Sequence, residues 1–301
     1  MRLAAVDIGS NAIRLQITNV TQFEGQINFK KLEYLRFPLR LGIDVFHTKR
    51  ISDTNRRKFV KLMKAFKLLI DLYEVDDYMV CATSAMRESE NGRDIAHEVK
   101  EDIGLKIHII DGNQEAEMIN LALKSYLDEQ AYLHIDVGGG STELNIYKNK
   151  QKVAAKSFKI GSVRAMEDIV HPSTWKHMKD FIHEHIHPKD KVVSIGTGGN
   201  IAKIFELSNP RKNKEFLTIK KIEEIQQHLA SFSYEERVHK LNLNHDRADV
   251  IIPASTIYLS AMKAAASSKM LVPDVGLKDG LMQVLYEKNL KKLNAQKAHT
   301  K

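Results

Sequence analysis

The chain has 301 residues, of which 43% are hydrophobic and 28% are charged. This length and composition exclude a disordered chain and a small disulfide-stapled scaffold, and they predict two domains that each bury a core. The single cysteine excludes an internal disulfide, and the formal net charge of +8 favours polyanionic partners.

Strand-like runs alternate with helical periods in the first part of the chain. The pattern predicts strands at 3–6, 14–20, 26–34, 78–83 and 106–109, and helices at about 52–74, 92–102 and 113–127. The helix at 52–74 has the clearest signal, because its apolar residues recur at helical spacing behind the capping residues Ser52 and Asp53. This mixture is typical of an α/β fold.

The second part of the chain repeats the alternation. Strands are predicted at 132–137, 143–148, 152–158 and 192–195, and helices near 162–170, 173–187, 199–208, 219–230, 248–267 and 276–292. We therefore expect two domains, 1–125 and 126–301, with the option that the last helix, 276–292, crosses back onto the first domain.

A short motif occurs once in each half of the chain. Val6-Asp7-Ile8-Gly9-Ser10-Asn11 precedes the strand that holds Arg14, and Ile135-Asp136-Val137-Gly138-Gly139-Gly140-Ser141 precedes the strand that holds Glu143. Each copy reads as strand, aspartate, glycine turn and strand, which indicates two similar domains. A third glycine turn, Gly196-Thr197-Gly198-Gly199, lies between a predicted strand and a predicted helix.

Glycine turns of this kind suit phosphate oxygens. A glycine directly after a strand aspartate lets the backbone turn tightly and direct successive amide hydrogens into one concavity. A single Asp-x-Gly hairpin is more often a plain turn. The presence of three such turns favours phosphate binding.

The motifs occur in an order that resembles a known family. DIGSNAIRL (7–15), ATSAMRESEN (82–91), DGNQEAEM (111–118), DVGGGSTEL (136–144), SFKIGSVR (157–164), GTGGN (196–200), RADVIIPAS (247–255) and DVGLKDGLM (274–282) are similar to motifs of the Ppx/GppA family of exopolyphosphatases and guanosine pentaphosphate phosphohydrolases. The resemblance implies two ribonuclease-H-like domains of the actin, sugar kinase and chaperone ATPase superfamily, with an interdomain cleft. It also implies release of the terminal phosphate from inorganic polyphosphate, or conversion of pppGpp to ppGpp.

The resemblance implies a role for each motif residue. Glu115 corresponds to the catalytic glutamate, and Asp7, Asp136 and Glu143 correspond to carboxylates that organise Mg²⁺, or another hard divalent cation, and water. The residues that it assigns to phosphate binding are Gly9, Ser10, Asn11, Arg14, Arg87, Gly138, Gly139, Gly140, Ser141, Gly196, Thr197, Gly198 and Gly199. These roles agree with chemistry, because hard cations prefer oxygen ligands and guanidinium groups fork onto phosphate oxygens.

Two of the motif residues have alternative interpretations. Asp111-Gly112-Asn113-Gln114 resembles a capping box, which would place Glu115 in a first helical turn, where an acid merely complements the helix dipole. Arg164 is either scaffolding at the start of a helix or a substrate contact. Gln114 and Lys278-Asp279 depart from the family pattern, which leaves the preference between polyphosphate and pppGpp open.

Two other functions compete with this interpretation. An ATP-dependent kinase or nucleotide-binding module of the same superfamily is the nearer alternative, since a fold does not fix a function. A zinc hydrolase is the remote one, because His183, Glu184 and His187 satisfy the H-E-x-x-H signature. Pro188 directly follows that signature, and 13 histidines make a chance match unsurprising.

The expected partner is inorganic polyphosphate or guanosine pentaphosphate. The aromatic residues are few and are not interleaved with a basic motif, which argues against a nucleic-acid partner. No apolar stretch has the length of a signal peptide core or a membrane span, so we expect a cytoplasmic protein with no membrane partner. A homodimer is a family-level expectation.

Overall fold

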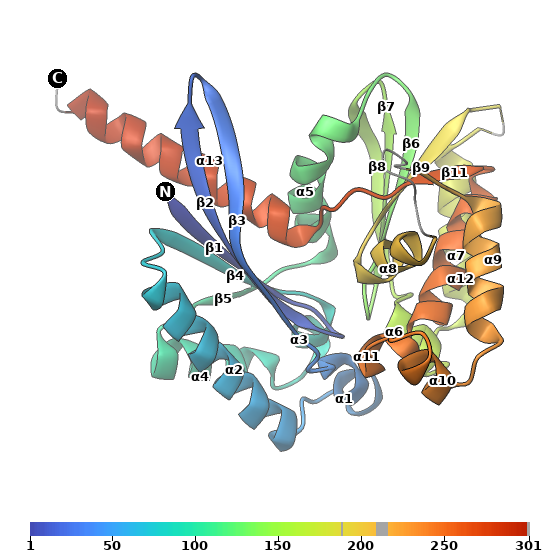
Figure 1. Cartoon of the computed structure of the whole chain (residues 1–301), viewed down its shortest axis with the longest axis horizontal. Helices are drawn as coiled ribbons and strands as arrows, with labels where there is room; N and C mark the ends of the chain where they lie inside the picture. The colour runs from blue at the N-terminus through green and yellow to red at the C-terminus, as the bar shows by residue number, and fades with distance from the viewer. Residues whose placement is uncertain (188, 209–215, 300–301) are drawn as a thin grey trace. The chain divides into compact units, whose positions relative to one another are not determined.

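The computed structural model describes residues 1–187, 189–208 and 216–299. The chain divides into two compact units, the first formed by Met1–Ala122 with Gly276–Lys301 and the second by Leu123–Val275. A five-stranded sheet lies at the centre of unit 1 and a six-stranded sheet at the centre of unit 2 (Figure 1). The last helix lies in unit 1, which is the arrangement of the option that helix 276–292 crosses back onto the first domain.

Unit 1 has the strand order β3-β2-β1-β4-β5. Its strands are β1 (Arg2–Ile8), β2 (Ile13–Phe23), β3 (Gln26–Phe37), β4 (Asp77–Ala82) and β5 (Ile107–Ile109). Its helices are α1 (Leu41–Thr48), α2 (Asp53–Leu72), α3 (Ser84–Glu88), α4 (Gly92–Ile103), α5 (Gly112–Leu123) and α13 (Leu277–His299). The first three strands pair antiparallel, whereas β4 and β5 continue the sheet parallel to β1.

Unit 2 repeats this arrangement in the order β10-β11-β9-β6-β7-β8. Its strands are β6 (Ala131–Val137), β7 (Thr142–Lys148), β8 (Gln151–Phe158), β9 (Val192–Thr197), β10 (Phe216–Thr218) and β11 (Lys269–Leu271). The short 3-10 helix Lys124–Tyr126 precedes them, and the α-helices are α6 (Ser162–Met166), α7 (Pro172–His185), α8 (Gly199–Leu207), α9 (Ile219–Ala230), α10 (Tyr234–His239), α11 (His245–Ala248) and α12 (Ile251–Ala264).

The two sheets share one topology, which confirms the fold class expected from the sequence. In each sheet three antiparallel strands are followed by two parallel ones, and β10 adds an antiparallel edge strand in unit 2. This is the strand order and direction of a ribonuclease-H-like sheet. The aspartate motifs occupy the same place in both units, at the carboxyl end of the central strands β1 and β6.

Helix α2 shows how sequence pattern becomes structure. Phe59, Met63, Phe66 and Ile70 recur at helical spacing, and all four are buried. The predicted capping residue Ser52 accepts a hydrogen bond from the backbone N–H of Asn55, which satisfies one of the donors left open in the first turn. The clear signal of this segment therefore reflects both a buried face and a capped start.

The core of unit 2 lies between one face of its sheet and the helices α7, α8, α9 and α12. Strand residues such as Leu133 and Ile135 contribute to it, together with Ile182 of α7 and Ile257 of α12. The predicted helix 248–267 corresponds to α12, which begins at Ile251 because the chain turns at Asp249 and Val250 after α11. In the ranges described above, every helix is too short or too polar to span a bilayer.

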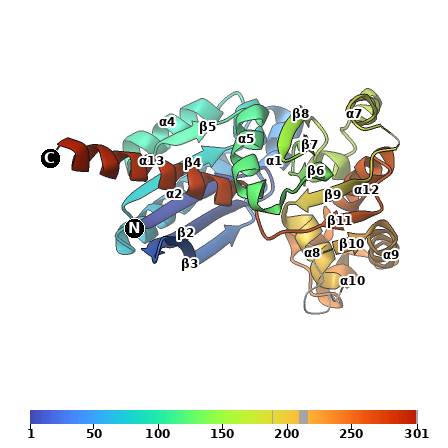
Figure 2. The same ribbon diagram turned by 90° about the horizontal axis from the view of Figure 1, so that it is seen from above.

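Helix α13 packs on the sheet of unit 1, along β1, β2 and β4 (Figure 2). Lys288 and Asn289 donate hydrogen bonds of 2.9 and 2.8 Å to Oδ2 of Asp77. Gly280 lies so close to α5 that a Cβ atom there would be 2.0 Å from the carbonyl oxygen of Met118. Only glycine allows this approach, so the sequence of α13 is matched to unit 1.

We predict that Gly280→Ala destabilises the protein. The added methyl group would meet backbone, which cannot move aside cheaply, so the free energy of unfolding should fall by about 1–3 kcal/mol. Gly276→Ala is the matched control, because nothing lies within 4 Å of its Cβ position. Urea unfolding followed by circular dichroism measures both variants, and equal midpoints would contradict the packing of α13 described here.

Candidate active site

The first glycine turn joins β1 to β2 in unit 1. The N–H of Gly9 donates to the carbonyl oxygen of Ala12 at 3.2 Å, which closes the turn. Asp7 and Arg14 are register partners on the two strands, and Nη1 of Arg14 lies 2.8 Å from Oδ2 of the buried Asp7. The turn therefore presents a paired carboxylate and guanidinium beside its backbone.

The segment after β4 reaches the same turn. Both the N–H and the hydroxyl of Thr83 donate to the carbonyl of Ile8, at 3.1 and 3.4 Å. The hydroxyls of Ser10 and Ser84 share a hydrogen bond of 2.7 Å. The sequence interpretation did not single out Ser84, although it lies inside the motif at 82–91.

Arg87 extends this arrangement to the end of β5. It follows Ser84 on α3, and its Nη1 donates to the carbonyl of Ile110 at 2.7 Å. Ile110 immediately precedes the residues that begin α5. Two of the motifs found in the sequence, at 7–15 and 82–91, thus meet at the carboxyl ends of β1, β4 and β5, where the third begins.

Glu115 lies in the first turn of α5. The carboxylate of Asp111 accepts the N–H groups of Asn113 and Gln114 at 2.9 and 2.8 Å, and Oε1 of Gln114 accepts the N–H of Asp111 at 3.0 Å. The predicted capping box is therefore present. Glu115 is only 9% exposed, however, and a residue that merely complements a helix dipole has no reason to be buried at the cost of desolvation.

The thiol of Cys81 is influenced by the charges of both Asp7 and Glu115. Its thiol is fully buried on β4, where Cys81 is the register partner of Asp7. Burial, and then the negative charges of Asp7 and Glu115, raise the pKa of this thiol to about 12. Both carboxylates therefore lie near the same sulfur atom, and the thiol remains protonated and unreactive at neutral pH.

Helix α1 fixes the outer side of the first turn. The N–H of Arg40 donates to the carbonyl of Asn11 at 3.1 Å, and that of Gly42 donates to the carbonyl of Ser10 at 2.8 Å. A Cβ atom on Gly42 would lie 3.0 Å from Cβ of Ser10. The turn is therefore pre-formed by backbone contacts and does not depend on a ligand for its shape.

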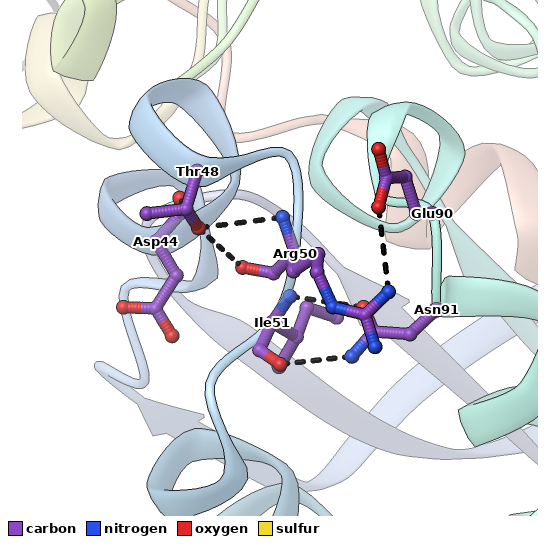
Figure 3. A network of polar contacts seen from close by, with 6 residues as sticks. All are labelled: Asp44, Thr48, Arg50, Ile51, Glu90 and Asn91. Carbon is purple, nitrogen blue, oxygen red and sulfur yellow. Dashed lines mark hydrogen bonds and ion pairs between the residues drawn. The ribbon is translucent and has the colours of Figure 1, made fainter.

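A polar network holds the chain after α1 against the loop between α3 and α4 (Figure 3). The side chain of Asn91 accepts the N–H of Ile51 at 2.9 Å and donates to the carbonyl of Ile51 at 2.8 Å. Beside it, Arg50 and Glu90 form an ion pair of 3.3 Å between two largely exposed side chains. Asn91 thereby ties together the segments that carry α1 and α3.

The second glycine turn joins β6 to β7 in unit 2. Asp136 and Glu143 are register partners, as Asp7 and Arg14 are in unit 1. Glu143 is 1% exposed, and its Oε1 accepts a hydrogen bond of 2.8 Å from the hydroxyl of Ser157 on β8. The duplicated motif thus carries an acid and a base in unit 1 but two acids in unit 2.

Residues of helix α6 donate hydrogen bonds to the carbonyl groups of this turn. The N–H groups of Ser162 and Val163 donate to the carbonyls of Gly138 and Gly139, both at 2.9 Å, and Nε of Arg164 donates to that of Gly140 at 2.7 Å. These contacts favour the scaffolding interpretation of Arg164, whose side chain is buried.

The amide side of the turn is open. In the part of the chain that the structure describes, the N–H groups of Gly139, Gly140 and Ser141 have no acceptor. Gly161 holds α6 against the turn, since a Cβ atom there would lie 2.3 Å from the carbonyl oxygen of Gly139. Carbonyls bound on one side and amides open on the other are what an anion-binding turn requires.

The third glycine turn lies beside the second. Thr197 is the register partner of Asp136, and Gly198 follows with a φ of +107°. A Cβ atom on Gly198 would lie 3.2 Å from Oδ1 of Asp136 and 3.1 Å from the hydroxyl of Tyr258. Tyr258 donates to the carbonyl of Thr197, and burial together with Asp136 raises the pKa of its hydroxyl well above the usual value.

Polar side chains continue one row deeper on this face of the sheet. His134 and Asn145 are register partners on β6 and β7, directly behind Asp136 and Glu143. The ring of His134 lies 2.8 Å from the hydroxyl of Thr197 and 2.9 Å from the side-chain nitrogen of Asn145. Complete burial lowers the pKa of His134 to about 3, so the imidazole is neutral. The apolar strand pattern of the sequence gave no signal for these residues.

The carboxylates fit magnesium better than a caged transition metal. Within the described ranges, no group of three or more His, Cys, Asp or Glu side chains could hold a metal ion. Asp136 and Glu143 nevertheless form a pair of hard oxygen donors on adjacent strands. Mg²⁺ is commonly bound by one or two carboxylates, with waters and substrate phosphates completing the shell.

The H-E-x-x-H match does not form the site that its signature suggests. Helix α7 ends at His185, so His183 and His187 do not share a helical face as the expected helix 173–187 required. The ring nitrogen Nδ1 of His187 accepts the N–H of Lys189 at 3.2 Å. Pro188 lies outside the described residues. This geometry argues against the zinc alternative.

Comparison with known proteins identifies the family of the chain. The profile of the Ppx/GppA phosphatase family matches residues 20–291. The chain belongs to this family. A crystal structure of the family member from Aquifex aeolicus is 26% identical, with a TM-score of 0.73 over 95% of this chain and 98% of that one. An exopolyphosphatase from Cytophaga hutchinsonii is 19% identical, and its TM-score of 0.80 over 96% of this chain and 98% of that one shows the shared fold.

A curated relative covers part of the chain. The bifunctional 3-dehydroquinate synthase/phosphatase of Fusobacterium nucleatum is 34% identical over 171 residues, which are 54% of this chain and 26% of that protein. The chain therefore spans about a quarter of the length of this relative. Membership of the Ppx/GppA family indicates a hydrolase of phosphate compounds.

We predict that Asn91→Ala weakens the frame around the first turn. Both backbone groups of Ile51 would lose their partner, and a part-buried unsatisfied group costs about 1–3 kcal/mol, so the free energy of unfolding should fall by that amount. Arg50→Ala is the matched control, since an exposed ion pair contributes only about 0–1 kcal/mol. Thermal unfolding by calorimetry compares the two, and a larger loss for Arg50→Ala would contradict this ranking.

Proposed function

We propose that the chain is a phosphoanhydride hydrolase that releases the terminal phosphate of inorganic polyphosphate, with conversion of pppGpp to ppGpp as a second reaction of the same site. The observation that carries the proposal is the place of Glu115, which is buried in the first turn of α5 and near the Asp7–Arg14 pair. A carboxylate that can orient water, together with cationic donors for phosphate, is what hydrolysis of an anhydride needs. Family membership supports the same chemistry.

Phosphate oxygens would be bound by two kinds of group. In unit 1, Arg14 at the start of β2 and Arg87 on α3 offer forked guanidinium donors. The guanidinium group of Arg87 contacts Ile110, the residue after β5. The open amides of Gly139, Gly140 and Ser141 offer neutral donors in unit 2. Such pre-formed donors stabilise charge that develops during the reaction, because they need little reorganisation.

Asp136 and Glu143 would hold a magnesium ion, with Asp7 as the corresponding carboxylate of unit 1. When bound, Mg²⁺ would neutralise phosphate charge and so make the phosphorus easier to attack. Glu143 already accepts a hydrogen bond from Ser157, which fixes the orientation of one oxygen. The negative charge of Asp7 at the first turn is already compensated by Arg14, so this carboxylate would depend less on a metal ion than Asp136 and Glu143.

Glu115 would act on the attacking water. The carboxylate accepts a proton as the water oxygen bonds to the terminal phosphorus. The bond from that phosphorus to the bridging oxygen breaks, and the bridging oxygen keeps the electron pair on the shortened chain. Orthophosphate leaves, and Glu115 returns its proton to solvent, so that atoms and charge balance.

We expect Glu115→Gln to lower kcat by about a hundredfold or more, because the amide cannot accept the proton, while KM changes little. Glu117→Gln is the control, since Glu117 is on the same helix but exposed. Phosphate release from polyphosphate of defined length measures both variants. A Glu115→Gln enzyme with the turnover of the parent protein would remove Glu115 from the reaction.

Substrate and metal are tested together in one assay. We expect phosphate release from polyphosphate and from pppGpp in the presence of Mg²⁺, and a fall to background when a chelator removes the ion. The excess positive charge of the chain favours polyphosphate as the faster substrate. Hydrolysis confined to ATP, or transfer of phosphate to a sugar, would instead support the kinase alternative.

A further inference from the structure

Thr197 is held by two buried side chains from behind the third glycine turn. Its hydroxyl lies 2.8 Å from Nε2 of His134, and its carbonyl accepts the hydroxyl of Tyr258. Nδ1 of His134 in turn lies 2.9 Å from Nδ2 of Asn145. All four residues are buried, and Thr197 is 1% exposed. This chain of contacts restricts which group can donate each hydrogen.

A histidine ring with one hydrogen can lie between Thr197 and Asn145 in two arrangements. In the first, Asn145 donates to Nδ1, and Nε2–H donates to the oxygen of Thr197. In the second, the amide of Asn145 is turned over, Nδ1–H donates to its oxygen, and the hydroxyl of Thr197 donates to Nε2. The two arrangements direct the hydroxyl hydrogen of Thr197 in opposite directions.

The buried end of Asn145 decides between them. In the part of the chain that the structure describes, Oδ1 of Asn145 has no partner. In the first arrangement the amide nitrogen keeps one hydrogen bond and the atom without any partner is this carbonyl oxygen. In the second the atom without any partner would be the amide nitrogen, with both of its hydrogens buried. Buried N–H groups without acceptors are rarer in proteins than under-satisfied carbonyls, so the first arrangement is favoured.

In the first arrangement the hydroxyl of Thr197 accepts from His134 and must direct its own hydrogen elsewhere. No acceptor for that hydrogen is found among the described residues. Thr197 is also the register partner of Asp136 and immediately precedes Gly198, so it lies at the turn expected to hold phosphate. An acceptor oxygen of a bound phosphate would complete its hydrogen bonding.

We propose that His134 and Asn145 are positioning residues that fix Thr197 as a hydrogen-bond donor to a phosphate oxygen. This inference rests on the proposed function. In it, the hydroxyl of Thr197 is the hydrogen-bond donor, and His134 orients that hydroxyl. A free hydroxyl can rotate and would need to be ordered when substrate binds. Here His134 orders it in advance, and Tyr258 fixes the backbone of the same residue.

The kinetic test compares variants that keep or remove the side-chain N–H at position 134, which donates to the hydroxyl of Thr197. The amide of glutamine reaches about as far as Nε2 of histidine, whereas that of asparagine reaches only as far as Nδ1. We expect Thr197→Val and His134→Asn each to lower kcat/KM for polyphosphate roughly tenfold to a hundredfold, as for a lost hydrogen bond to a charged group, and His134→Gln to retain most of the activity. The double variant of His134→Asn with Thr197→Val should be no worse than either single one.

A matched control separates orientation from packing. Tyr147 lies on the same face, one row deeper than Asn145, and its hydroxyl has no partner among the described residues. Tyr147→Phe should therefore leave kcat/KM unchanged. If His134 served only the core, His134→Asn would lower thermal stability with kcat/KM preserved, or its effect would add fully to that of Thr197→Val. Either result would overturn the proposal.

Two further measurements do not depend on turnover. Nitrogen-15 NMR of the free protein, with the ring signals assigned by their loss in His134→Gln, should show hydrogen on Nε2; hydrogen on Nδ1 would overturn the proposal. Calorimetry with tripolyphosphate should give a dissociation constant raised about tenfold or more by Thr197→Val. If Thr197→Val weakens binding of tripolyphosphate but the parent protein hydrolyses neither polyphosphate nor pppGpp, the proposed function fails while the role of Thr197 stands. An unchanged dissociation constant in Thr197→Val would refute the role of Thr197.

Discussion

In each unit, an aspartate ends the central strand and a tight backbone turn follows it. The neighbouring parallel strand ends at the same level, because residues in register lie side by side across the sheet. Asp7 therefore has Cys81 beside it, and Asp136 has Thr197 beside it. The segments after β4 and β9 are thereby brought to the turns, so that two strand ends separated in sequence form one polar surface in each unit.

The two copies of the motif have different charge. In unit 1 the partner of the aspartate is Arg14, and the resulting ion pair neutralises the carboxylate. In unit 2 the partner is Glu143, so that two carboxylates lie on adjacent strands and favour a cation. The same backbone thus supports two kinds of binding.

Much of the fold could be predicted from the sequence, because long elements carry many independent signals. The strands β1 to β9 and the helices α2 and α9 agree with the spacing of apolar residues. The short elements α1, α3, β10 and β11 were missed, since so few residues define only a weak period. The first two turns could be predicted because a glycine lies two positions after the strand aspartate in each motif. The contribution of Tyr258 could not, because its hydroxyl reaches Thr197 from a helix whose sequence is otherwise apolar.

The polar face of β6 lowers the stability of the fold, and burial of the apolar face must compensate for this loss. Alternate residues of this strand point to opposite sides, so that Leu133 and Ile135 enter the core while His134 and Asp136 lie on the other face. Among the described residues, the hydroxyl of Tyr147 and Oδ1 of Asn145 on that face have no partners, and such buried groups reduce stability. A sheet selected for stability alone would carry apolar residues there. Departures from local rules of this kind are expected at functional sites, and here they lie directly behind the carboxylates of the second turn.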